Sequence, residues 1–205
     1  MTAPLLTSAG LKSLPVLLTS IFILRAAAAK AALLPAYLKS SCRQLTTAGT
    51  TTVIGLLGTD GVTRSMENLL AKARGLEEEG ISTWIYSGAY PADSGHITGT
   101  LRSDIVLIDK ILGGKVAMSD HRSSMPSTQA YASLAAEARI GGMLSGKAGV
   151  LHIHMGDGKR GLEPVLEILE TTELPISVFR PTHVNRNPML TNRLSNSHCR
   201  AVLLI

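Results

Sequence analysis

The sequence predicts an α/β fold built on a parallel sheet, on the strength of three observations. Apolar, strand-like segments recur at intervals of roughly 26–35 residues from residue 51 onward. A helical pattern lies between each pair of segments. Polar side chains able to do chemistry follow the strands directly, at the edge of a parallel sheet where functional sites lie. These patterns are typical of an open doubly wound sheet or of a barrel.

The first half of this pattern begins with a buried strand at residues 51–57 (TTVIGLL), which is β-branched and apolar. A turn at residues 58–61 leads into a helix over residues 65–79, which carries an apolar stripe and ends at Gly80. Residues 82–87 (STWIYS) form the second strand, and the amphipathic residues 102–111 form a short helix. One strand–helix–strand unit is therefore expected here.

The second half continues the alternation. The expected elements are a strand at 115–119 (KVAMS), an Ala-rich helix at 129–144, a strand at 150–155, a helix at 162–170 and a fifth strand starting at 176–179. The last fifteen residues and residues 5–41 do not continue the pattern.

The composition excludes several functional classes. With 45% hydrophobic and 17% charged residues, the chain is expected to form a packed body. The net charge of +5 is scattered, and only 3% of residues are aromatic, so no nucleic-acid partner is expected. The two cysteines have neither disulfide-framework nor zinc-ribbon spacing, and no dinucleotide or phosphate-binding loop motif follows a strand.

The apolar run at residues 14–24 (LPVLLTSIFIL) bears on localisation. It is too short to span a bilayer, so no membrane partner is expected. Lys12 before it and small residues after it give it the look of a secretory signal, which would place a mature N-terminus near Ala32. We expect a cytoplasmic protein, with secretion as the alternative if this run is a signal.

Three short motifs carry candidate chemistry. In GGKVAMSDHR, Lys115 lies in an apolar strand: it either reaches out to solvent from the strand start or is a neutral amine able to form a carbamate. In HIHMGDGK, His154 is the last strand residue, where a ligand or a core histidine would lie, and His152 shares its face. In PTHVNRN, His183 is followed by Arg186, which could grip a carboxylate. Together they suggest a metallohydrolase acting on an acidic substrate.

These motifs belong to a longer series that closely resembles the bacterial isoaspartyl (β-aspartyl) dipeptidases of the amidohydrolase superfamily. The series begins with TTAGTTTVIGLLGTDGVTRSMENLLAKARGLEEEGIS and continues with SGAY, ITGT, SDHRS, AAEAR, HMGD and PTHVNRN, over about residues 44–190. The resemblance implies a partial (β/α)8 barrel of the TIM type with about five of eight βα units over residues 46–190, an irregular, divergent leader over residues 1–45 and an irregular, divergent tail over residues 191–205. It also implies a zinc dipeptidase that cleaves the β-aspartyl bond of small acidic dipeptides and forms homo-oligomers.

The resemblance also implies roles for individual residues. Lys115 would be carbamylated and would bridge two zinc ions, with His154 and His183 as further ligands. Tyr90 would polarise the scissile carbonyl. Thr59, Tyr90, Arg122 and Arg186 would bind substrate, the two arginines through its carboxylates. His152 stands where the family has an apolar residue, so we expect it to be buried.

Two family features are missing from this sequence. No His-x-His motif occurs in residues 1–45, and the aspartate that the family carries near the end of its barrel is absent. We therefore expect one zinc ion or none, and little or no dipeptidase activity from this chain alone. The alternative is a non-catalytic barrel fragment that binds at most one metal ion.

Overall fold

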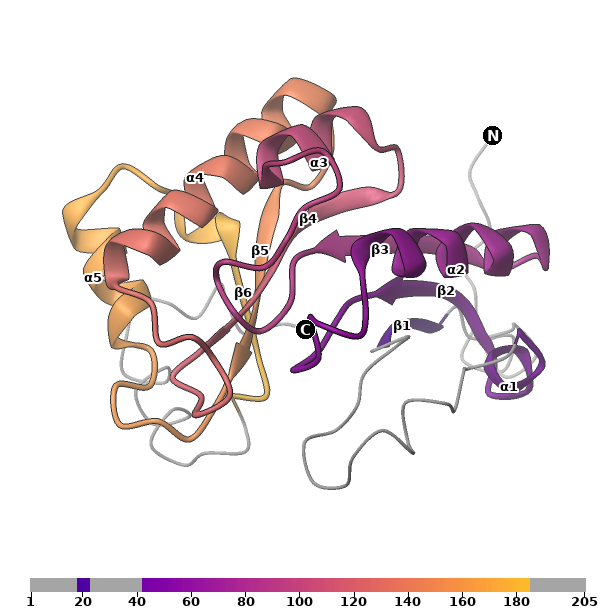
Figure 1. Ribbon diagram of the computed structural model, residues 1–205, viewed down its shortest axis with the longest axis horizontal. Helices are drawn as coiled ribbons and strands as arrows, with labels where there is room; N and C mark the ends of the chain where they lie inside the picture. Colours follow the sequence, from indigo (N-terminus) through magenta and orange to yellow (C-terminus); the bar gives the residue numbers. More distant parts are fainter. Residues whose placement is uncertain (1–17, 23–41, 185–205) are drawn as a thin grey trace, which may run out of the picture.

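The computed structural model describes residues 18–22 and 42–184, which form one six-stranded parallel sheet with helices packed on its outer side (Figure 1). Strand order equals chain order, from β1 (Leu18–Phe22) through β2 (Thr50–Gly55), β3 (Ser82–Ser87), β4 (Ile111–Met118) and β5 (Val150–Met155) to β6 (Phe179–Thr182). The sheet curls as a half-barrel does, which confirms the predicted partial α/β barrel.

The predicted strands are all present, and one more is found where none was expected. Residues 18–22 lie inside the apolar run at residues 14–24 and pair in parallel with β2. The leader is therefore not irregular throughout, and its predicted boundary at residue 45 falls inside helix α1 (Cys42–Thr47). The tail at 191–205 lies outside the described residues.

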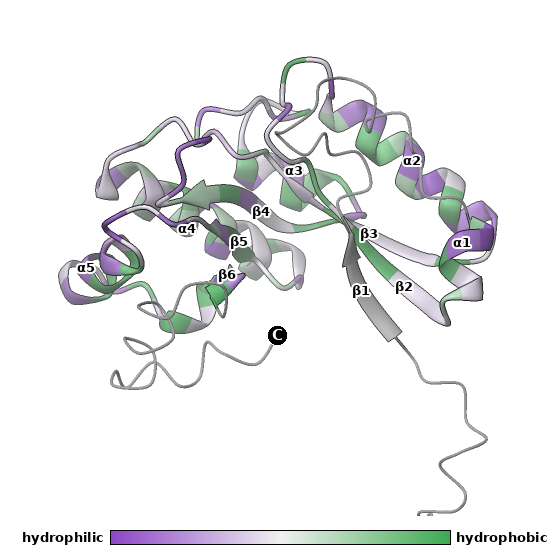
Figure 2. Ribbon diagram, turned by 90° about the horizontal axis from the view of Figure 1, so that it is seen from below, coloured by the Kyte–Doolittle hydropathy of each residue, from purple (hydrophilic) through white to green (hydrophobic). Residues whose placement is uncertain are grey.

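The connecting helices begin and end at residues suited to those positions. Ser65 caps α2 (Met66–Glu78), Thr100 caps α3 (Leu101–Leu107) and Ser127 caps α4 (Thr128–Ser145), each by accepting a hydrogen bond from a backbone N–H. The last connecting helix, α5 (Glu163–Thr171), carries a proline in its first turn. Hydrophilic and hydrophobic bands alternate along α2, as expected of a helix with one buried face (Figure 2).

In two regions the element boundaries differ from the prediction by more than two residues. Residues 102–111 are not one helix: α3 ends at Leu107, and Ile111 already begins β4. The predicted start of the fifth strand at residue 176 is a short 3-10 helix, η3 (Ile176–Val178), and the strand itself begins at Phe179. Both errors arise because apolar spacing alone does not mark where a short helix gives way to a strand.

The sheet separates the core from the candidate site. Alternate strand residues such as Val116 and Ile153 pack into the apolar clusters beneath the helices. Residues of the opposite parity face the inside of the curl, where a small cluster of Leu56, Tyr86 and Val150 lies. In the described part of the chain, no helix is both long enough and apolar enough to cross a membrane.

Candidate metal and substrate site

The inner face of β4 and β5 carries the predicted reactive side chains. Lys115 pairs in register with His152, and Ala117 pairs with His154, so that all four point to the same side of the sheet. Val116 and Ile153, with the opposite parity, pack against the helices instead. Parallel pairing therefore brings a lysine and two histidines, from motifs that are distant in sequence, onto one surface.

Lys115 lies in the middle of β4 and is only 4% exposed, so the alternative in which it reaches out to solvent from the strand start is wrong. Its Nζ stands 5.4 Å from the centre of the Tyr90 ring. Burial lowers the pKa of this amine to about 7, although the Asp120 carboxylate opposes the change. A large fraction of Lys115 is therefore neutral, and thus nucleophilic, near neutral pH.

His154 connects the tyrosine to the polar residues that follow β4. Its Nδ1 lies 3.0 Å from the Tyr90 hydroxyl, and the two rings stack with centres 4.5 Å apart. Its Nε2 lies 3.0 Å from Arg122 Nη2 and 3.1 Å from Asp120 Oδ2. Burial, followed by the positive charge of Lys115, lowers the pKa of His154 to about 3. The ring is neutral at physiological pH, which is the form that binds zinc.

Asp120 and Arg122 form a forked ion pair beside this histidine. Arg122 donates from Nε to Oδ1 at 2.9 Å and from Nη2 to Oδ2 at 2.6 Å, and its backbone N–H also bonds to Oδ1. Burial works to raise the pKa of Asp120, but the hydrogen bonds and the charge of Arg122 prevail and hold it at about 2. The guanidinium of Arg122 is thus oriented by the Asp120 carboxylate.

The loops that follow β4 and β5 fix this pair in place. The Gly156 N–H donates to Met118 O at 3.1 Å, and the Gly158 N–H donates to Ser119 O. A Cβ atom at residue 156 would lie 2.5 Å from the Asp120 Cα, so only glycine permits this approach. The glycines after HIHM therefore position Asp120 against His154.

The remaining predicted residues lie around the same centre or outside the described residues. His183 follows β6 with a φ of 65°. Its ring packs edge-on against the ring of His154, with the two ring centres 4.8 Å apart. Thr59 is half-buried and follows Gly58, whose carbonyl accepts a hydrogen bond from the Tyr90 N–H. Arg186 lies outside the described residues.

His152 is buried, as expected, and lies one layer deeper. Its ring stacks on Tyr86 with centres 5.1 Å apart. Burial, with the charge of Lys115 acting in the same direction, lowers its pKa to about 2. A neutral, stacked imidazole supports the inner wall of the site.

Sequence reasoning assigned no role to Asp120, the residue that pairs with both Arg122 and His154. Its position at the end of a strand, two residues before the arginine, was the available signal. His121, between these two residues, has a side chain that is 86% exposed, and its Nδ1 lies 3.7 Å from Asp120 Oδ1 at the outer edge of the cluster.

The donor set suits a zinc ion in kind but is small. Among residues 42–184, no group of three or more His, Cys, Asp and Glu side chains is placed to hold a metal ion. His154 and His183 are neighbours with imidazole donors, and the buried Lys115 amine adds oxygen donors only as a carbamate. The two imidazoles are of the donor type that zinc takes, but the described residues do not by themselves complete a zinc site.

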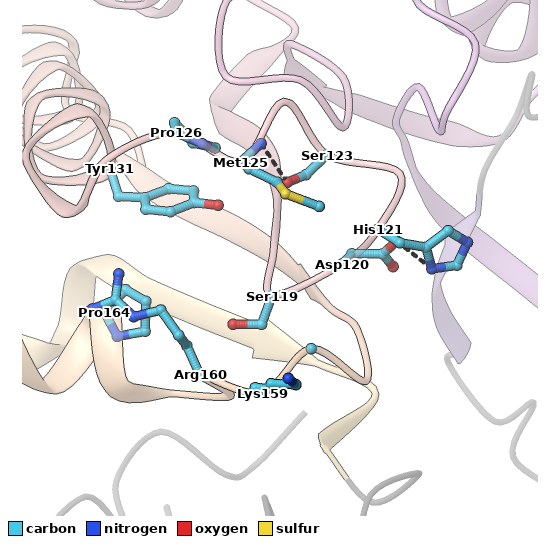
Figure 3. A pocket seen from close by; sticks show the side chains of 11 residues that line it. Ser119, Asp120, His121, Ser123, Met125, Pro126, Tyr131, Lys159, Arg160 and Pro164 are labelled. Carbon is cyan, nitrogen blue, oxygen red and sulfur yellow. Dashed lines mark hydrogen bonds and ion pairs between the residues drawn. The ribbon is translucent and has the colours of Figure 1, made fainter.

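A separate cavity of about 340 Å³ lies beside the cluster, between the loops that follow β4 and β5 (Figure 3). Met125, Pro126 and Tyr131 line one side, and Lys159 and Arg160 line the other. Asp120 is the residue of the site cluster that also lines this cavity. The cavity therefore adjoins the candidate site and does not contain it.

Comparison with known proteins finds solved structures that are similar to this chain. No family model matches the chain. It is similar to a crystal structure of a β-aspartyl dipeptidase from the thermophilic, keratin-degrading Fervidobacterium islandicum AW-1, with 48% identity and a TM-score of 0.74 over 76% of this chain and 42% of that one. It is also similar to the dipeptidase from the same organism in complex with the β-Asp-Leu dipeptide, with 43% identity and a TM-score of 0.82 over 86% of this chain and 48% of that one. The chain thus spans less than half the length of either structure.

Proposed function

Because this chain is a relative of the β-aspartyl dipeptidases over 42–48% of their length, we propose that it carries part of a zinc-dependent site for hydrolysing the β-aspartyl bond of small acidic dipeptides. The observation that carries the proposal is the contact of His154 with both Tyr90 and Arg122 at the carboxyl edge of the strands. The Tyr90 hydroxyl and the Arg122 guanidinium both contact the neutral His154 imidazole there.

Each of these groups has a task in the proposed reaction. The Tyr90 hydroxyl donates a hydrogen bond to the scissile carbonyl oxygen as negative charge develops on it. Arg122 binds a substrate carboxylate through its Nη1, which is not among its bonds to Asp120, while Asp120 holds the guanidinium in orientation through Nε and Nη2. The β-aspartyl dipeptide has a free α-carboxylate that an ordinary dipeptide lacks at that position, so a dedicated arginine distinguishes the two.

Zinc would be held by His154, His183 and the carbamate of Lys115, and it supplies Lewis acidity and an activated water when bound. The neutral Lys115 amine forms that carbamate by adding to CO2 and releasing one proton. Its burial favours the neutral form that this addition needs. His152, stacked on Tyr86, lies one layer beneath these groups.

The assay is zinc-dependent release of leucine from β-Asp-Leu by the 205-residue chain. We expect slow turnover that requires added zinc, with at most one zinc ion bound per chain. Tyr90→Phe is expected to lower kcat by about 10²-fold, because it removes the donor to the developing oxyanion. The control is Glu170→Ala, whose exposed side chain lies on α5 away from the cluster and whose loss should leave turnover unchanged.

A second candidate function rests on the small donor set of the described residues, two imidazoles and one lysine. In that case the chain is a metal-binding barrel segment without turnover. One bound zinc ion with no leucine release would support this second function. Turnover that persists without zinc, or that is unchanged in Tyr90→Phe, would overturn the first.

A further inference from the structure

Asp104 of α3 is fully buried, and its carboxylate accepts hydrogen bonds from both ends of the loop between β3 and α3. The Ser87 hydroxyl, at the end of β3, donates to its Oδ2. From the far end of the loop, the Ile97 N–H donates to Oδ2 at 3.2 Å, and the Thr98 N–H and hydroxyl both donate to Oδ1 at 2.8 Å. One side chain therefore closes a loop of ten residues between Ser87 and Thr98.

Tyr90 lies within that closed loop, three residues after Ser87. Its backbone N–H donates to Gly58 O at 3.2 Å, and its carbonyl accepts from the Ala117 N–H at 3.0 Å. These bonds set where the tyrosine backbone lies between β2 and β4. Asp104 holds both ends of the loop by hydrogen bonds, and these bonds constrain the backbone before and after Tyr90.

A serine, a histidine and an aspartate meet here, but in an order that excludes nucleophilic catalysis. Ser87 donates to Asp104, so its oxygen is the acceptor in the contact with His96 Nδ1, 2.8 Å away. A serine nucleophile must instead give its proton to the histidine. Ser87 is also only 1% exposed, so the trio holds the loop and does not react.

We propose that Asp104 is a positioning residue that holds the loop between β3 and α3 and thereby aims the Tyr90 hydroxyl at the reacting carbonyl. The proposal rests on the proposed function for its catalytic consequence, but the placement of Tyr90 can be measured without turnover. Burial works to raise the pKa of Asp104, and its contacts with His96, Ser87 and Thr98 lower it to about 2, so the carboxylate is charged at neutral pH.

The test labels the four tyrosines of the full chain with 3-fluorotyrosine and records their 19F resonances, with that of Tyr90 assigned through Tyr90→Phe. In Asp104→Asn we expect the Tyr90 resonance to shift and broaden while that of Tyr131, on α4, stays in place. We expect kcat on β-Asp-Leu to fall roughly tenfold to a hundredfold, with a smaller change in KM, because misplacement impairs the reaction more than binding. The control Asp93→Asn, in the same loop but exposed, should change neither.

An unchanged Tyr90 resonance in folded Asp104→Asn would overturn the proposal. If Asp104→Asn does not fold, Ser87→Ala removes one of the bonds and decides the matter by the same resonance. A wild-type chain without turnover would count against the proposed function alone, because the displacement of Tyr90 in the variants is still read from the spectrum.

Discussion

Lys115→Met is expected to make the fold more stable at pH 7 and to abolish zinc binding. The native lysine is buried beside Tyr90, and burial lowers its pKa from 10.5 to about 7. Between these values the unfolded chain binds more protons than the folded one, so this group contributes stability that rises with pH. At pH 7 the buried amine lowers the free energy of unfolding by at most about 4 kcal/mol. Methionine has a similar length and no charge, so the substitution removes this cost.

The measurement is urea denaturation of both chains from pH 7 to pH 10, in CO2-free buffer so that the amine stays unmodified. We expect the gain of the variant to be largest near pH 7 and to shrink as pH approaches 10.5, where lysine is neutral in both states. Lys159→Met is the control: this lysine is exposed, and its loss should change stability by no more than about 0.5 kcal/mol. A gain that is independent of pH would contradict this account of the buried amine.

Gly113→Ala is expected to destabilise the fold by about 3 kcal/mol or more, because the sheet has no room for a single methyl group at that position. A Cβ atom there would lie 2.1 Å from the carbonyl oxygen of Val150 and 3.0 Å from its nitrogen, and neither backbone atom can rotate away. The strands β4 and β5 would have to separate, and β5 carries His154. Zinc binding should therefore weaken together with stability.

The same substitution at Gly75 is the matched control and should have the opposite sign. Gly75 lies inside α2, and a Cβ atom there meets nothing within 4 Å. Alanine restricts the unfolded chain and favours the helix, so a gain of up to about 1 kcal/mol is expected. Fluorescence of the single tryptophan, Trp84 in β3, reports unfolding of both variants. Equal effects at the two positions would rule out the steric explanation for Gly113.

The parts of the fold that were predictable from sequence are those whose cause is local. Strands at residues 82–87 and 150–155 were predicted with their observed bounds, because apolar β-formers there are flanked by turn residues. The end of α3 was missed because the apolar spacing continues past it, whereas in the structure the distant Lys147 donates to the carbonyls of Ile105 and Ile108 at 2.6 Å. Strand β1 was missed because a short apolar run has no periodicity to distinguish a strand from a signal segment.

The candidate site likewise contains some residues that were predictable from sequence and others that were not. The rule that parallel strands present their carboxyl ends together was enough to group Tyr90, His154 and His183, which do lie together. Lys115 lies within its strand and joins them because it faces the same side of the sheet as His154. The roles of Asp104 and Asp120 were not predictable, because each is defined by partners that only the folded chain supplies. Carboxylates on loops and helices are common in any sequence, and only burial and contacts distinguish these two.

The order of the strands in the sheet has a consequence for biosynthesis. Each strand of the sheet pairs with the one translated just before it, so the sheet can grow in the direction in which the ribosome delivers the chain. Tyr90 and Lys115 emerge early, but His154 joins them only with β5, and His183 follows β6. The scaffold can therefore consolidate on a nascent chain before His183, the last histidine of the candidate site, is synthesised.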